Sequence, residues 1–371
     1  MTDVRAGERR ARLGMCGLIP MAAPALSKVV LEHGVEEVWS ALREDGGSTT
    51  WGRKARAVDV DELERATVAC GARFVIPGDD EWPVGLAGLS SAEVGAQGGE
   101  PFGLWVRGRL PRWEGAVAMV GSRAASSYGT HVTTELAADL AGEFRCIVSG
   151  LAYGIDAAAH RGALGVDGVT VGCLAGGVDV PYPAMHARLA DAVLKRGALI
   201  SEQPPGSRPM KHAFLARNRL IAALSDGVIL VEAALRSGAR NTAAWASALG
   251  RPLMAVPGPV TSSLSVTPHR LIREAQAVLV ASARDVDELL SPLGATPEAP
   301  AREDDRPLDT LAPLLRELRE AVAVGEEVGA GELSARTGQP MMACLAGASE
   351  LVEKGWLVDG TMGGWRLPSP R

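Results

Sequence analysis

Several short apolar runs of the chain end in residues whose chemistry suits an anion. The run AVAMV is followed by Gly121-Ser122-Arg123, the run CIV by Ser149-Gly150, and two later runs by Gly176-Gly177 and Ser237-Gly238. Glycine allows a ligand to approach the backbone closely, serine supplies a hydroxyl group, and the arginine fork matches phosphate. We expect a rim that binds phosphate groups, although the glycine at any one position could serve only to make a turn.

A second group of candidates lies in the segment KHAFLARNR, residues 211–219. Between residues 195 and 219 six residues are basic and only Glu202 is acidic, whereas the whole chain has a net charge of -6. Lys211, Arg217 and Arg219 can pair with phosphates, and Phe214 can stack on an exposed base. These contacts together are typical of proteins that hold single-stranded nucleic acid. The alternative is a solvated helix face with a packed phenylalanine.

Asp156 and His160 are spaced four apart in a helical segment, which places them on one face. With Ser149 nearby, the pair could act in acid-base or metal chemistry or form part of a hydrolytic triad. We favour a structural role, in which Asp156 caps the helix and His160 fixes the adjoining loop by a hydrogen bond. No second histidine or carboxylate at a fixed spacing supports catalysis, so we expect no catalytic residue and no metal site.

The elements that carry these residues follow a regular order. From residue 115, short apolar runs alternate with helical stretches as far as AVLV at residues 277–280. This alternation predicts an α/β fold with a parallel sheet covered by helices on both faces. Ligands bind such sheets beyond the carboxyl ends of the strands, which is where the glycine and serine residues fall.

The flanking regions have different patterns. Residues 1–70 contain helix-length amphipathic segments and predict a small helical module, and residues 71–291 hold the strand-rich core with an extra strand or two at its start. A segment rich in Pro, Ala and acidic residues, 292–306, predicts a linker. Three helical stretches and two short strands in residues 307–371 follow the order of a winged helix-turn-helix domain.

Composition limits the functions that the chain can have. Apolar residues make up 47% and charged residues 22% of the 371 residues, which is typical of a soluble globular protein. The five cysteines are scattered, so we expect neither zinc nor disulfides and place the protein in the reducing cytoplasm. No apolar run reaches the roughly 18 residues that a membrane helix needs. The sequence has neither a dinucleotide fingerprint nor a P-loop, so we expect no nucleotide cofactor.

Five motifs in this order resemble the DNA-processing protein A family (DprA, also called Smf): VGSRAASSYG, VSGLAYGIDAAAH, GGVDVPYP, the long block FLARNRLIAALSDGVILVEAALRSGARNTA, and GRPLMAVPGPV. The resemblance implies an extended Rossmann-like core that binds single-stranded DNA. It also implies a homodimer that protects incoming or exposed strands and helps to load a RecA-type recombinase in transformation or homologous recombination. Residues 1–70 resemble the family's helix-hairpin-helix or SAM-like module, and the tail resembles its winged helix.

The resemblance also implies which residues contact the strand. Carried onto this sequence, it places Phe214 near a base and the phosphate contacts on the following residues: Gly121, Ser122, Arg123, Ser149, Gly150, Lys211, Arg217, Asn218 and Arg219. We add Ser237 and Gly238 from the strand-end pattern described above.

Three departures from the family pattern affect this expectation. Tyr153 and Ala184 stand where family members usually or often carry a cation, and Ala275-Gln276 replaces a usual Gly-Ala pair. His186 or Arg188 could substitute for the missing cations. We expect weaker and more salt-sensitive DNA binding than in a typical member, because fewer direct contacts remain.

Two other functions remain open at this point. Related Rossmann-like folds bind or cleave nucleotides, and a glycine and serine rim with Glu232 could do the same; turnover lost in Glu232→Ala would favour such an enzyme. A regulator that contacts DNA through the C-terminal winged helix is a further alternative. The segment LSARTGQPMMACLAGASELVEKG is poor in basic residues, which disfavours a recognition helix there.

Overall fold

The computed structural model describes residues 2–18, 22–291, 311–361 and 363–368. The chain divides into two compact units, residues 1–295 and residues 296–371, which are described separately. The linker predicted at residues 292–306 lies outside the described residues. None of the helices in the described ranges is both long and apolar enough to cross a membrane.

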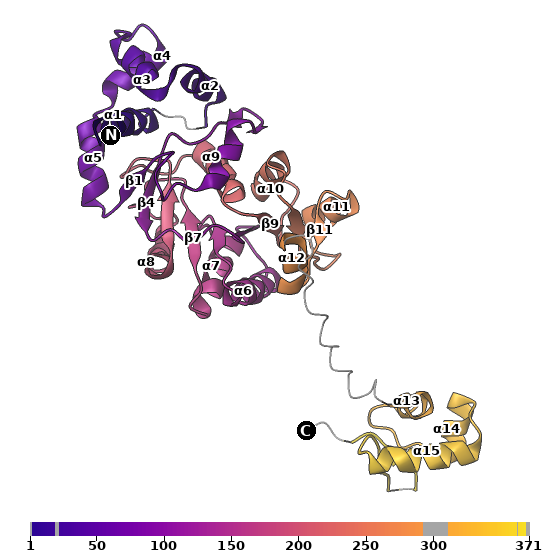
Figure 1. The fold of residues 1–371 in the computed structure, drawn as a ribbon. Helices are drawn as coiled ribbons and strands as arrows, with labels where there is room; N and C mark the ends of the chain where they lie inside the picture. The colour runs from indigo at the N-terminus through magenta and orange to yellow at the C-terminus, as the bar shows by residue number, and fades with distance from the viewer. Residues whose placement is uncertain (1, 19–21, 292–310, 362, 369–371) are drawn as a thin grey trace. The chain divides into compact units, whose positions relative to one another are not determined.

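The first unit begins with five helices (Figure 1). Their bounds are α1 (Thr2–Cys16), α2 (Pro24–His33), α3 (Val35–Glu44), α4 (Thr50–Ala57) and α5 (Val60–Ala69). Thr49 and Asp59 cap α4 and α5, each accepting a hydrogen bond from a backbone N–H in the first turn. The helices share a small core that includes Met15, Leu26 and Val38.

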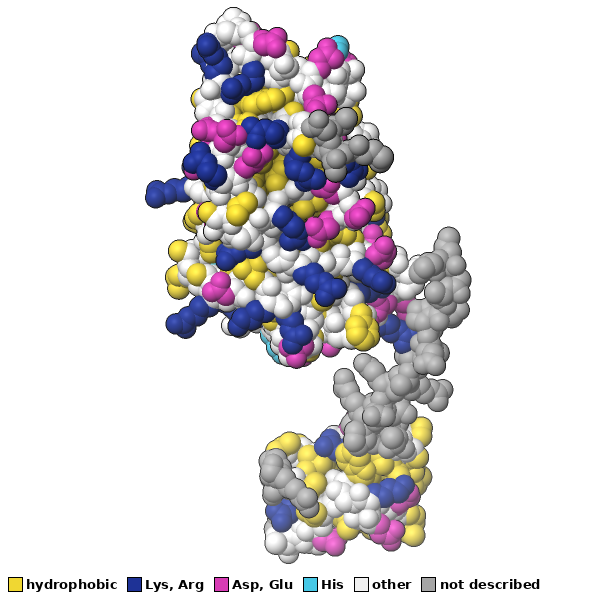
Figure 2. Space-filling view, turned by 60° about the vertical axis from the view of Figure 1, so that its left-hand side comes forward, with side chains coloured by type: hydrophobic (Ala, Val, Ile, Leu, Met, Phe, Trp, Pro, Cys, Tyr) yellow, Lys and Arg dark blue, Asp and Glu magenta, His cyan; other side chains and the backbone are white. Residues whose placement is uncertain are grey.

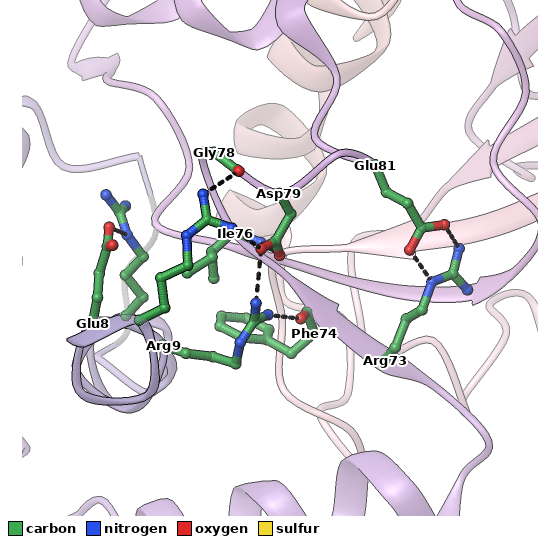
Figure 3. A network of polar contacts seen from close by, with 10 residues as sticks. Glu8, Arg9, Arg73, Phe74, Ile76, Gly78, Asp79 and Glu81 are labelled. Atoms are coloured by element: carbon green, nitrogen blue, oxygen red, sulfur yellow. Dashed lines mark hydrogen bonds and ion pairs between the residues drawn. The ribbon is translucent and has the colours of Figure 1, made fainter. Parts of the chain in front are cut away.

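The first helix is attached to the strand-rich part of the unit by arginine side chains (Figure 3). Arg9 donates to the Phe74 carbonyl at 2.6 Å and to the Asp79 carboxylate at 2.8 Å. Asp79 also accepts a hydrogen bond from the Ile76 N–H, so the same carboxylate shapes the turn that follows the first strand. A buried hydrogen bond of 2.8 Å from Trp105 Nε1 to Thr67 Oγ1 attaches α5 to the same part of the unit.

A nine-stranded sheet forms the centre of the unit. Its spatial order is β1-β4-β8-β7-β6-β5-β9-β10-β11, and every neighbouring pair from β8 to β11 is parallel. The strand β4 is antiparallel to both β1 and β8. The bounds are β1 (Arg73–Val75), β4 (Leu104–Gly108), β5 (Val117–Val120), β6 (Ile147–Ser149), β7 (Thr170–Cys173), β8 (Ala198–Ser201), β9 (Gly227–Leu230), β10 (Leu253–Ala255) and β11 (Val278–Leu279).

Helices cover both faces of this sheet (Figure 1). Successive side chains of β5 point to opposite faces, so Ala118 and Val120 join one core while Val117 and Met119 join the other. The helices are α6 (Ser127–Gly142), α7 (Ile155–Gly165) and α8 (Ala187–Arg196) on one side, and α9 (Lys211–Ala223) and α10 (Ala239–Ala248) on the other, with α11 (Val266–Arg273) and α12 (Ala283–Leu290) near the β11 edge. The predicted α/β fold with a mostly parallel sheet is confirmed; its first two strands run as an antiparallel extension.

Shorter elements complete this unit: the 3₁₀ helices η1 (Val84–Ser90) and η2 (Ala184–His186), and a hairpin of β2 (Glu93–Val94) and β3 (Gln97–Gly98). The second unit contains α13 (Pro313–Glu320), α14 (Ala330–Thr337) and α15 (Met341–Glu353). An antiparallel pair, β12 (Val358–Asp359) and β13 (Trp365–Arg366), follows them. Leu318, Leu333 and Leu351 are buried in a core of its own.

Candidate nucleic-acid interface

The order of the strands creates a crevice at the carboxyl edge of the sheet. The strand β5 lies between β6, which follows it in the chain, and β9, which comes much later. The connections that leave β5 and β9 therefore diverge, and such a switch point is where open α/β sheets bind ligands. A cavity of about 780 Å³ occupies this position, and we call it the strand-end cavity.

The strand-end cavity gathers most of the predicted contact residues. Its walls come from the loop after β5, the start of α7, the helix α9 and the loop after β9. Nine of the predicted residues line it, namely Gly121, Ser122, Arg123, Lys211, Phe214, Arg217, Asn218, Ser237 and Gly238. Sequence reasoning missed Arg236, which also lines the cavity and is exposed. Its position directly before Ser237, in the same strand-end loop, is the signal that could have found it.

Three predicted contact residues do not line the strand-end cavity. The Ser149 hydroxyl is buried and donates to the Met119 carbonyl at 2.7 Å. Arg219 is 1% exposed and forms a two-point ion pair with the Glu202 carboxylate, including an Nη2–Oε1 distance of 2.6 Å. Both side chains are buried and bonded within the protein. The prediction that Ser149 and Arg219 contact phosphate is therefore wrong.

Gly150 is the third of these residues, and its surroundings give it a different role. Its N–H donates to Asp156 Oδ2 at 3.1 Å and so is not free for a phosphate. A Cβ atom at this position would lie 1.5 Å from Arg217 Nη1, much closer than any real contact. The glycine is therefore needed because the Arg217 guanidinium passes over its backbone.

Arg217 provides a buried cation at the cavity wall. Its side chain is 5% exposed, and its nearest acidic group is Asp156, at 3.9 Å between Nη1 and Oδ2. Among the described residues, Arg217 Nε and Nη1 have no hydrogen-bond acceptor. Burial lowers the pKa of Arg217 below its ordinary value, and the Asp156 carboxylate partly opposes this effect. The buried guanidinium therefore places a positive charge at the cavity wall, and this charge favours an anion in the cavity.

Two exposed cations stand at the mouth of the strand-end cavity. The Arg123 guanidinium lies over the Phe214 ring, with 4.6 Å between Cζ and the ring centroid. Lys211 is the first residue of α9, where the helix dipole also favours anions. Together with Arg217 and Arg236 they make four cations around the cavity, against Asp156 as the one acidic residue among its described lining residues.

Asp156 and His160 have structural partners. Asp156 accepts hydrogen bonds from the N–H groups of Gly150 and Ala152, so it fixes the loop before α7 instead of capping that helix in the usual way. Thr170 donates to the Ile147 carbonyl and must therefore accept from His160 Nδ1, at 2.7 Å. His160 thus joins α7 to β7 and not to the adjoining loop. Burial lowers the pKa of His160 to about 3, which keeps the ring neutral.

The surface of the first unit carries charges of both signs. On the face drawn in Figure 2, Lys and Arg side chains of the first unit lie among Asp and Glu side chains. Within the described residues, no group of three or more His, Cys, Asp or Glu side chains is arranged to hold a metal ion. The strand-end cavity differs from that mixed surface because its cations are gathered around one hollow.

Two curated proteins with similar sequences cover most of this chain. A DprA relative from Mycobacterium tuberculosis is 45% identical over 319 residues, which cover 83% of this chain and 79% of the relative. Protein Smf of Escherichia coli is 40% identical over 263 residues, covering 69% of each chain. Both alignments are longer than the strand-rich core alone, so the similarity includes part of a flanking region.

Two solved structures resemble the chain in three dimensions. DNA processing protein A (DprA) of Streptococcus pneumoniae superposes with a TM-score of 0.61 at 32% identity, covering 74% of this chain and 94% of that one. The Helicobacter pylori protein, described for its single-stranded DNA binding mode, gives a TM-score of 0.51 at 28% identity and covers 59% and 95%. The model of the family DNA recombination-mediator protein A matches residues 73–291, the sheet and its helices, and the chain belongs to this family.

Proposed function

We propose that the chain binds single-stranded DNA in the strand-end cavity. The observation that carries the proposal is the arrangement of Arg123, Lys211 and Arg217 around Phe214 in one hollow. Cations that track a backbone beside an aromatic ring on which a base can stack are the usual means of holding a single strand. The Helicobacter pylori relative described above for single-stranded DNA binding supports the same ligand.

The proposed activity is binding without reaction. Glu232, the residue that a nucleotide-cleaving enzyme would use here, accepts hydrogen bonds from the Ser126 N–H at 2.9 Å and from the Ser126 hydroxyl at 2.5 Å. Its carboxylate holds the start of α6 and does not line the strand-end cavity. Asp156, the acidic residue that does line it, is engaged by the loop that precedes α7.

We further propose that the protein protects incoming or exposed strands in the cytoplasm and helps to load a RecA-type recombinase in transformation or homologous recombination. The description of its family as a recombination mediator supports this role. The order of α13 to α15 and the β12-β13 pair supports a winged helix-turn-helix domain in the second unit. A second copy would pack on the free edge of β11, where Val278 and Leu279 expose about half of their surface.

The experiment is a fluorescence anisotropy titration of a labelled single-stranded 50-mer and the matching duplex at several salt concentrations. We expect tighter binding of the single strand, with affinity lost in Arg123→Ala and Lys211→Ala. Each lost phosphate contact should lower the slope of log K against log salt by about 1. Lys195→Ala is the matched control, because this exposed lysine of α8 does not line the cavity.

Binding of the single strand that neither cavity variant weakens would exclude this site. Binding of free mononucleotides with no preference for longer oligonucleotides would instead favour the nucleotide-binding alternative. The recombinase step is measured separately, as the rate at which a RecA-type protein forms filaments on strands already coated with this protein.

A further inference from the structure

A set of aromatic rings continues the strand-end cavity along the carboxyl edge of the sheet. The Phe214 and Tyr182 rings lie 5.5 Å apart between centroids, and both residues line the cavity. Tyr153 directly follows Ala152, another lining residue, and its ring meets the His186 ring at 5.0 Å in an edge-on contact. The rings therefore come from the loop before α7, the loop around η2, and α9.

Hydrogen bonding fixes the two loops beside one another. His186 is buried, and its Nδ1 is 2.9 Å from the Leu151 carbonyl, so the ring donates this hydrogen bond. Leu151 has a left-handed backbone with φ of 57°, a strained conformation that the surrounding contacts must hold in place. His186 therefore joins the two loops inside the protein. It does not replace either of the cations missing at Tyr153 and Ala184.

The two tyrosines are exposed and carry no structural bond through their hydroxyl groups. Tyr182 is 49% and Tyr153 42% exposed, and in the described part of the chain neither hydroxyl has a hydrogen-bond partner. Tyr128 is different, because its hydroxyl donates to the Pro257 carbonyl at 2.5 Å. Exposed rings that are held in place on one side but free on the other present a flat apolar surface to a ligand.

We propose that Tyr153 and Tyr182 form a stacking surface for the bases of single-stranded DNA that leave the strand-end cavity. This inference rests on the proposed function. It assigns base stacking to the nucleotides that lie just outside the strand-end cavity. Every base has a flat face, so stacking holds a strand without requiring a particular sequence. Beyond Arg123 and Lys211 the strand is then held mainly through its bases. The next cation in the chain after Tyr182 is the exposed Arg188, which follows η2.

The proposal reverses one expectation from the sequence. Salt weakens DNA binding because paired phosphates release counterions, and the slope grows with the number of phosphates paired. A tyrosine that stacks on a base releases no counterion and adds affinity at all salt concentrations. Replacing one cation by the ring of Tyr153 therefore predicts a shallower salt dependence, not the more salt-sensitive binding expected from a count of contacts.

The test compares Tyr153→Ala, Tyr153→Phe and Arg123→Ala in the full chain, with single-stranded oligonucleotides of normal and partly abasic sequence. Tyr153→Ala should weaken binding of the normal strand about fivefold or more and leave the salt slope unchanged, whereas Tyr153→Phe should bind like the wild type. Arg123→Ala should lower the slope by about 1. Phe144→Ala is the control, since this ring is 98% exposed but precedes β6 and so lies at the opposite edge of the sheet.

Abasic nucleotides identify the group that Tyr153 contacts. If the abasic positions are those at which Tyr153 stacks, the wild type should bind the abasic strand as weakly as Tyr153→Ala binds the normal strand. On the abasic strand, Tyr153→Ala should then cause no further loss of affinity. An equal loss from Tyr153→Ala on normal and abasic strands would overturn the stacking surface, as would wild-type affinity in Tyr153→Ala while Arg123→Ala loses binding. Failure of every protein to bind the single strand would overturn the proposed function itself.

Discussion

Gly150 shows how one missing side chain permits a binding group. Gly150→Ala would bring a Cβ atom within 1.5 Å of Arg217 Nη1, so the guanidinium would have to leave its place beside the strand-end cavity. We expect this variant to bind single-stranded DNA about tenfold more weakly, the effect of losing roughly 1.4 kcal/mol of binding free energy. The measurement is an anisotropy titration. Gly142→Ala is the control because a Cβ there meets no atom within 4 Å, and equal affinities for the two variants would contradict the explanation.

Ala275 has a locally strained backbone. Its φ is 53°, in the left-handed region that disfavours a Cβ atom by about 1 kcal/mol or more. Ala275→Gly should therefore increase the free energy of unfolding by up to about 1 kcal/mol, although the more flexible unfolded chain offsets part of the gain. Urea unfolding checks this prediction. Ala281→Gly, at an exposed position without positive φ, should lower stability, and a decrease in both variants would contradict the assigned strain.

At the scale of elements, His160 makes the attachment of α7 to β7 sensitive to acid. Its pKa is about 3 in the folded protein and about 6.5 in an unfolded chain. The unfolded state therefore binds more protons between these values, and stability falls as the pH drops below 6.5, by roughly 1.4 kcal/mol per pH unit from this group. His160→Asn keeps a donor near Thr170 and does not titrate.

The measurement is the urea unfolding free energy of the wild type and His160→Asn between pH 7.5 and 5. The wild type should lose stability relative to the variant as the pH falls, because only its residue 160 takes up a proton on unfolding. A difference between the two proteins that stays constant with pH would show that His160 is protonated to the same extent in the folded and unfolded states.

The regular elements of the core could be predicted because the parallel strands from β5 to β10 are mostly apolar and the turns between them and the helices are marked by Gly, Ser and Pro residues. The strand-end rule also located the loops after β5 and β9, since it depends only on chain order. It failed for Ser149, whose hydroxyl bonds to the Met119 carbonyl. The basic segment misled for Arg219, whose partner Glu202 lies 17 residues away and comes close only when α9 packs on the sheet. Arg217 and Arg219 are two positions apart, so they leave the helix in different directions and only Arg217 lines the cavity.

At the scale of the whole molecule, the free edge of β11 predicts how copies associate. An edge strand with exposed apolar side chains favours pairing with another chain, and Val278 and Leu279 provide both features. We expect the wild type to be a dimer by size-exclusion chromatography with light scattering, and Val278→Asp with Leu279→Asp to be a monomer. Val68→Asp, on the exposed side of α5, should remain dimeric. A dimer that survives both edge substitutions would place the interface elsewhere.

The place of β9 in the sheet has a consequence for biosynthesis. A ribosome delivers β5, β6, β7 and β8 before β9, yet β9 pairs with the second side of β5 and leads into the loop that holds Ser237 and Gly238. Until then one side of β5 is an unpaired edge and a wall of the cavity is missing. A nascent chain thus gains its complete cavity only after about two thirds of the protein has left the ribosome. A half-made copy emerging near exposed DNA would lack the site with which to hold it.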